Sequence, residues 1–71
     1  MTGPSIRVAL NGAEREIPAG TTVLALLEQA GIDRRRIAVE LNREVLPKAR
    51  HADRALAAGD RVEIVTMVGG G

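Results

Sequence analysis

The stretch that decides how the fold begins reads Ile6-Arg7-Val8-Ala9-Leu10-Asn11-Gly12. Its apolar residues recur at every second position, which is the period of a half-buried β-strand. Asn11 and Gly12 both accept positive φ angles, so this dipeptide is the strongest short-range signal for a two-residue hairpin turn. The return strand is expected over residues 13–17. That strand is short and polar and Pro18 ends it, which is typical of the edge of a sheet.

The apolar spacing changes after this hairpin and predicts a helix. Thr21-Thr22 supplies a candidate N-cap. The next apolar residues fall at i, i+3, i+4 and i+7, on one helix face: Val23, Leu26, Leu27 and Ala30. Gly31 suits the position after the helix, where Ile32 is expected to pack back on Leu27. Because the helix is short, packing against a sheet must hold it.

The second half of the chain predicts three more strands, over residues 37–42, 45–46 and 61–68. Between the last two, the residues expected to form a single helical turn over one end of the core are Ala52, Ala55 and Leu56. The last strand is apolar on both faces, as a central strand would be. Strands arranged around one helix indicate an α+β fold, a mixed sheet of about five strands packed on one main helix. This is the β-grasp arrangement of ubiquitin-like proteins.

The chain has 71 residues, enough for one small domain that buries about 60% of its unfolded surface. We divide it into a flexible N-terminus (1–5), a β-grasp domain (6–68) and a flexible glycine tail (69–71). The N-terminus lacks the pattern of a signal peptide. The longest apolar run, residues 23–27, is far shorter than the roughly 20 residues that span a bilayer. We therefore expect a cytoplasmic protein without membrane contact.

Composition excludes several classes of function. The chain has no Cys, so it has no disulfide, no Cys-ligated metal and no thiol nucleophile. It has no aromatic residue, and its formal net charge is only +1. Nucleic-acid binding is therefore not expected, because both the stacking platform and the basic field are absent. The one basic run, Arg34-Arg35-Arg36, is interpreted as a solvated exit from the helix.

No catalytic or metal site is expected. Ser5 and His51 are the only residues of their types, and Ser5 lies in the N-terminal stretch, where nothing would hold a nucleophile in place. His51 lies in a polar stretch and is expected at the surface. One His and scattered carboxylates do not form a converging ligand set.

The chain ends in Gly69-Gly70-Gly71, directly after the last strand. A terminal carboxylate can be activated as an acyl-adenylate and then attacked by a nucleophile. A tail that threads a narrow passage in another enzyme needs glycine, because a Cβ would clash. The alternative is a frayed chain end.

In this order and at this length, several motifs together resemble the ThiS/MoaD family of sulfur carriers, and most of all its thiamine branch. The residues that carry the resemblance are Asn11-Gly12, Thr21-Thr22-Val23, Leu26-Leu27, Val39-Glu40-Leu41-Asn42, Val45-Leu46-Pro47-Lys48, Gly59-Asp60-Arg61-Val62-Glu63-Ile64-Val65 and the Gly-Gly end. They extend over residues 6–71.

The resemblance implies a co-substrate of other enzymes and not an enzyme. An E1-like (ThiF-like) adenylyltransferase, using ATP and magnesium, would activate the carboxylate of Gly71, and Gly70 would complete the reactive pair. A cysteine desulfurase or rhodanese-type donor would then supply sulfur to form a thiocarboxylate. A ThiG-like thiazole synthase would take this sulfur into the thiazole ring of thiamine. The carrier itself would bind no cofactor.

The strand pattern adds a candidate docking surface for these partners. Val65 and Met67 point away from the helix side, and Ala9 on the first strand points the same way. An exposed apolar patch on a small domain marks a partner surface. The alternative is that the chain's own loops cover it.

Three other functions remain open at this point. The chain could be the small subunit of molybdopterin synthase, a ubiquitin-like modifier joined through Gly71 to lysines, or a β-grasp binding module. A binding module would not need the terminal glycines.

Overall fold

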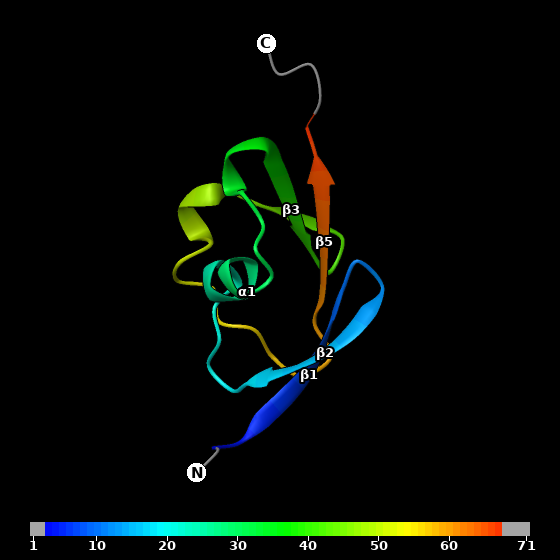
Figure 1. Cartoon of the computed structure of the whole chain (residues 1–71), viewed down its shortest axis with the longest axis vertical. Coiled ribbons are helices and arrows are strands. Elements are labelled where there is room, and N and C mark those ends of the chain that lie inside the picture. The colour runs from blue at the N-terminus through cyan, green and yellow to red at the C-terminus, as the bar shows by residue number, and fades with distance from the viewer. Residues whose placement is uncertain (1–2, 68–71) are drawn as a thin grey trace.

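The computed structural model describes residues 3–67, which form one mixed sheet with a helix packed across it (Figure 1). In chain order, the elements are β1 (Ser5–Leu10), β2 (Ala13–Pro18), α1 (Val23–Gln29), the 3-10 helix η1 (Arg34–Arg36), β3 (Ile37–Leu41), β4 (Glu44–Leu46), the 3-10 helix η2 (Lys48–Arg50) and β5 (Arg61–Thr66). The strand order across the sheet is β2-β1-β5-β3-β4. The predicted α+β class and β-grasp arrangement are thus confirmed.

The first hairpin forms where the alternating pattern predicts it. Asn11 and Gly12 have φ angles of 50° and 83°, the left-handed values that a two-residue hairpin turn requires. The two strands pair from Leu10 opposite Ala13 to Ser5 opposite Pro18. β2 lies at the edge of the sheet, as its polar sequence predicts.

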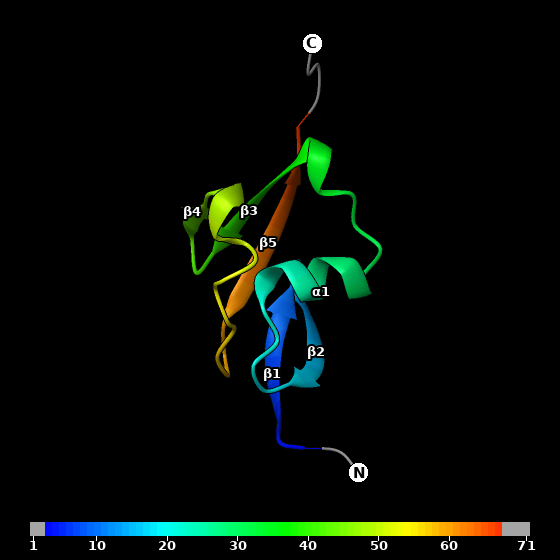
Figure 2. The ribbon, with the colours of Figure 1, turned by 90° about the vertical axis from the view of Figure 1, so that its left-hand side faces the viewer.

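β5 is the central strand, which explains its apolar sequence. It runs parallel to β1, with Leu10 beside Val62, and antiparallel to β3, with Leu41 beside Val62. Figure 2 shows α1 lying across one face of this sheet, and in Figure 1 no helix of residues 3–67 lies over the other face. The residues buried between sheet and helix are Val8, Leu10, Ile17, Val23, Leu26, Leu27, Ile37, Val39, Leu41, Leu56 and Val62.

α1 is fixed at both ends by the residues that the sequence indicates. The Thr22 hydroxyl accepts a hydrogen bond from the Ala25 N–H at 3.1 Å. At the other end, Gly31 adopts a φ of 72°, and the Ile32 N–H donates to the Leu27 carbonyl at 3.0 Å. This is a Schellman cap. Within residues 3–67, no helix has both the length and the apolar character needed to cross a bilayer.

The segment between β4 and β5 differs from its prediction. Its helical turn comes earlier, at η2, and both Ala52 and Ala55 are exposed, although Leu56 is buried as expected. The prediction for His51 was also wrong, because its side chain is completely buried. A histidine takes the core position that the alanines were expected to fill.

Two buried contacts of the imidazole explain why His51 is tolerated there. Its Nε2 lies 3.1 Å from the Leu46 carbonyl oxygen, and its Nδ1 lies 3.3 Å from Nη1 of Arg34. A guanidinium can only donate, so Nδ1 accepts and the Nε2–H donates to Leu46. The ring thus ties the end of β4 to η1. These partners lie 5 and 17 positions away in sequence, so no local pattern reveals them.

We expect His51→Leu to lower the free energy of unfolding by about 1–3 kcal/mol, because the Leu46 carbonyl and the Arg34 guanidinium each lose a buried partner. Urea denaturation at neutral pH measures this change. His51→Gln, which keeps a donor and an acceptor, should lose less. A His51→Leu protein as stable as the parent would contradict the assignment.

Candidate functional site at the outer face of the sheet

The face of the sheet opposite α1, here called the outer face, carries the exposed apolar side chains of the described chain. Val45 on β4 is 68% exposed, Val65 on β5 is 49% exposed and Met67 just beyond β5 is 48% exposed. Val65 is the cross-strand partner of Ala38 on β3. Because Val65 and Met67 are this exposed, no loop of residues 3–67 covers them. The alternative that the chain's own loops bury this patch does not hold for the described residues.

The last described residue of the chain is anchored on η1. The Met67 N–H donates to the Arg36 carbonyl at 2.8 Å, which extends the pairing of β3 and β5 by one step. The Asp33 side chain caps η1, because its Oδ1 accepts from the Arg35 N–H at 2.9 Å. Hydrogen bonds from the Arg35 side chain and backbone hold the pKa of the Asp33 carboxyl at about 2. η1, itself capped by Asp33, therefore holds the backbone at Met67, the last described residue.

The predicted site residues do not all lie together. Ala9 is on the outer face as predicted, but it is half-buried and pairs with Arg61 at the start of β5. Val65 lies four residues further along this strand. Gly70 and Gly71 lie outside the described residues, as do Val68 and the remainder of the predicted glycine tail.

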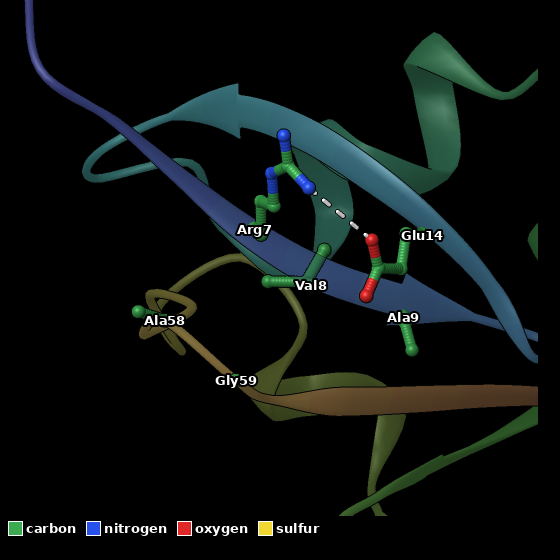
Figure 3. A pocket seen from close by; sticks show the side chains of 6 residues that line it. All are labelled: Arg7, Val8, Ala9, Glu14, Ala58 and Gly59. Carbon is green, nitrogen blue, oxygen red and sulfur yellow. Dashed lines mark hydrogen bonds and ion pairs between the residues drawn. The ribbon is translucent and has the colours of Figure 1, made fainter.

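A shallow pocket adjoins Ala9, far from the end of β5 (Figure 3). Its volume is about 240 Å³, and it is lined by Arg7, Val8, Ala9, Glu14, Ala58 and Gly59. Arg7 and Glu14 form an ion pair of 3.4 Å across its rim. Both side chains are more than 70% exposed, so water screens this pair.

Two carboxylates face each other in the middle of the outer face. Glu40 on β3 is the direct cross-strand partner of Glu63 on β5, and neither forms an ion pair among the described residues. Like charges directly opposite each other destabilise a sheet. Sequence reasoning missed both this pair and Val45, because the face and register of two strands are needed to place them.

The described residues offer no catalytic constellation. Within residues 3–67, no group of three or more His, Cys, Asp and Glu side chains is arranged to hold a metal ion. The Ser5 hydroxyl donates to the Glu16 carboxylate at 2.6 Å, whereas His51 is buried on the other side of the sheet. What this part of the chain presents is an exposed apolar surface.

We expect Glu63→Gln to raise the free energy of unfolding by about 0.2–1 kcal/mol at low salt, because it removes the repulsion from Glu40. Glu44→Gln is the control, since Glu44 faces Leu41 and no carboxylate. Chemical denaturation measures both variants. The interpretation fails if Glu63→Gln adds as much stability in a Glu40→Gln background as alone.

A five-stranded mixed sheet that grasps one helix defines the class of ubiquitin-like β-grasp proteins. Within that class, the chain belongs to the ThiS family, whose family model matches residues 8–71. The crystal structure of the thiamine biosynthesis protein ThiS from Geobacter metallireducens superposes with a TM-score of 0.81. The two chains are 28% identical, and the match covers 93% of this chain and 100% of that one.

The curated relatives include a sulfur carrier protein and two thiazole synthases. The sulfur carrier protein ThiS of Thermus thermophilus is 39% identical over 64 residues, 90% of this chain and 98% of that protein. The thiazole synthase of Paramagnetospirillum magneticum is 46% identical over 66 residues, 93% of this chain. The thiazole synthase of Magnetococcus marinus is 33% identical over the same length. The chain spans only 20% of each of these two thiazole synthases.

Proposed function

We propose that this protein carries sulfur as a thiocarboxylate on Gly71 and donates it to the thiazole ring of thiamine. The observation that carries the proposal is the family match, which runs from residue 8 through Gly71. A relative of nearly the same length, from Thermus thermophilus, is named a sulfur carrier. The absence of Cys is compatible with this role, because the sulfur would be bound to the C-terminal carbonyl carbon.

The proposed chemistry has two stages. A carboxylate oxygen of Gly71 attacks the α-phosphorus of ATP on an E1-like adenylyltransferase, and pyrophosphate leaves with magnesium. The terminal sulfur of a persulfide, on a cysteine desulfurase or rhodanese-type donor, then attacks the carbonyl carbon and AMP leaves. A thiol finally cleaves the resulting S–S bond and leaves the thiocarboxylate. ATP and magnesium belong to the activating enzyme, and the carrier contributes the carbonyl carbon.

A thiazole synthase is the proposed acceptor. Two relatives with that name contain a segment similar to this chain within a protein about five times longer. A carrier segment within the same polypeptide as its acceptor would raise the effective concentration of the tail at the acceptor's active site. The same two relatives favour the thiazole route over molybdopterin synthesis.

The outer face is the proposed docking surface for these enzymes. Val65 and Met67 are half exposed next to the point where the C-terminal segment leaves the sheet. An apolar contact there would bring the tail to the partner's active site in a defined direction, since Met67 is held by Arg36. Met suits such a surface because its flexible thioether adapts to more than one partner. Ala9 lies at the far end and would contribute only to a broad contact.

Intact mass spectrometry tests the proposed function. Incubation with ATP, magnesium, the adenylyltransferase and a sulfur donor should replace one oxygen by sulfur, at Gly71. Omission of ATP should leave the mass unchanged. Conjugates with other proteins would support a ubiquitin-like modifier instead, and an unchanged chain in the presence of an active adenylyltransferase would support a binding module.

We expect Met67→Asp to weaken adenylation by at least about tenfold in kcat/KM, because a charge replaces an apolar contact at the interface. The effect should appear in KM, and the urea midpoint should stay unchanged. Ala52→Asp is the control, since Ala52 is exposed but outside the outer face. Equal adenylation of Met67→Asp and wild type at sub-saturating carrier would contradict this docking surface.

A further inference from the structure

The second half of β5 has a neighbouring strand on one side only. β1 pairs with β5 at Ala9 and Leu10, opposite Arg61 and Val62, and then turns away at Asn11. Beyond that point only β3 continues beside β5 (Figure 1). The central strand of the sheet thus becomes an edge strand before it reaches the C-terminal segment.

The hydrogen bonds identify which backbone groups lie on the open side. Met67 bonds to Arg36 on the β3 side, and the antiparallel register places the backbone groups of Val65 on that side too. Ile64 and Thr66 therefore point the other way. The Ile64 N–H is satisfied by the Asn11 side-chain oxygen at 2.8 Å. Within residues 3–67, the Ile64 carbonyl and both backbone groups of Thr66 have no hydrogen-bond partner.

The other two edges of the sheet are protected against strand addition, and this one is not. β2 carries the charged run 14–16 and ends at Pro18, and β4 has only three residues and is followed by Pro47. Charges, proline and short length are the devices that prevent edge pairing. The open part of β5 is Ile64-Val65-Thr66, uncharged and β-branched throughout, which is a sequence that favours pairing.

We propose that an extended segment of the partner enzyme adds to this edge as an antiparallel strand next to Ile64 and Thr66. One partner residue would bond to both backbone groups of Thr66, and a second, two positions along, would donate to the Ile64 carbonyl. The partner residue between these two would lie on the outer face beside Val65, where an apolar side chain fits. The inference rests on the proposed function and adds the means by which the enzyme aligns the carrier.

The position of the edge argues for an enzyme segment over a second copy of the chain. Four residues, 68–71, follow Met67, the last described residue, and the proposed reaction needs them inside an enzyme. A strand added at Thr66 runs alongside the start of that segment and directs it. Two copies paired antiparallel at this edge would instead direct each C-terminal segment toward the β1–β2 turn of the other copy.

Amide hydrogen exchange by NMR tests the edge directly. In the free carrier, the Thr66 N–H should exchange rapidly, while the Val65 N–H is protected by β3. Addition of the purified adenylyltransferase, without ATP, should slow exchange at Thr66 and leave Val65 protected. Rapid Thr66 exchange in the saturated complex would overturn the proposal. Protection of Thr66 in the free carrier that increases with its own concentration would indicate self-association and also overturn it.

A proline variant provides the matched functional test. Both Thr66→Pro and Thr66→Val remove the hydroxyl, but only Thr66→Pro also removes the backbone N–H, which has no partner within residues 3–67 and whose loss an edge strand tolerates. We expect Thr66→Pro to bind the adenylyltransferase at least about tenfold more weakly than Thr66→Val. Equal binding of two folded variants would refute the edge contact. Sulfur incorporation into the wild-type protein tests the proposed function separately. The sulfur-carrier role and the strand addition at Thr66 can therefore fail independently of each other.

Discussion

The parallel pairing of β1 with β5 is the contact on which the rest of the structure depends. It is short: the Ala9 N–H donates to the Asp60 carbonyl and the Asn11 N–H to the Val62 carbonyl, both at 2.9 Å. It joins segments about fifty residues apart, so its loop-closure cost is offset only when the apolar face behind it is buried. Without it, the β1–β2 hairpin and the β3–β4–β5 unit would be two separate pieces. α1 covers both, which explains why its Leu26 and Leu27 are completely buried.

Local patterns predict most of this fold, because most of its elements are specified locally. Alternation predicts β1 and β3, the i, i+3, i+4 spacing predicts α1, and turn residues with positive φ angles end the strands near where they were expected. The segment around His51 could not be predicted this way. Its burial depends on two partners, Leu46 and Arg34, that the tertiary fold supplies. A buried histidine with both nitrogens bonded cannot be distinguished from a surface one by its neighbours in sequence.

The candidate site is predictable only in part, for a similar reason. Strand parity places Val65 and Met67 on the face away from the helix, and both are exposed there. Parity does not reveal the register between strands, which separates Ala9 from Val65 and brings Glu40 opposite Glu63. The outer face tolerates this unfavourable carboxylate pair because the core on the other face stabilises the fold. The core therefore does not constrain the residues of the outer face, and their side chains can suit a partner.

Asn11 links the fold to the proposed function. Its left-handed backbone conformation turns the chain from β1 into β2. Its side-chain oxygen accepts a hydrogen bond from the Ile64 N–H, the last backbone donor of β5 on this side that has a partner before the open edge begins. A longer β1 would pair with the whole of β5 and leave no free backbone groups beside the C-terminal segment. A shorter one would lose the contact that joins the two halves of the sheet. The position of this turn therefore divides β5 into a half that holds the fold together and a half that remains available to another protein.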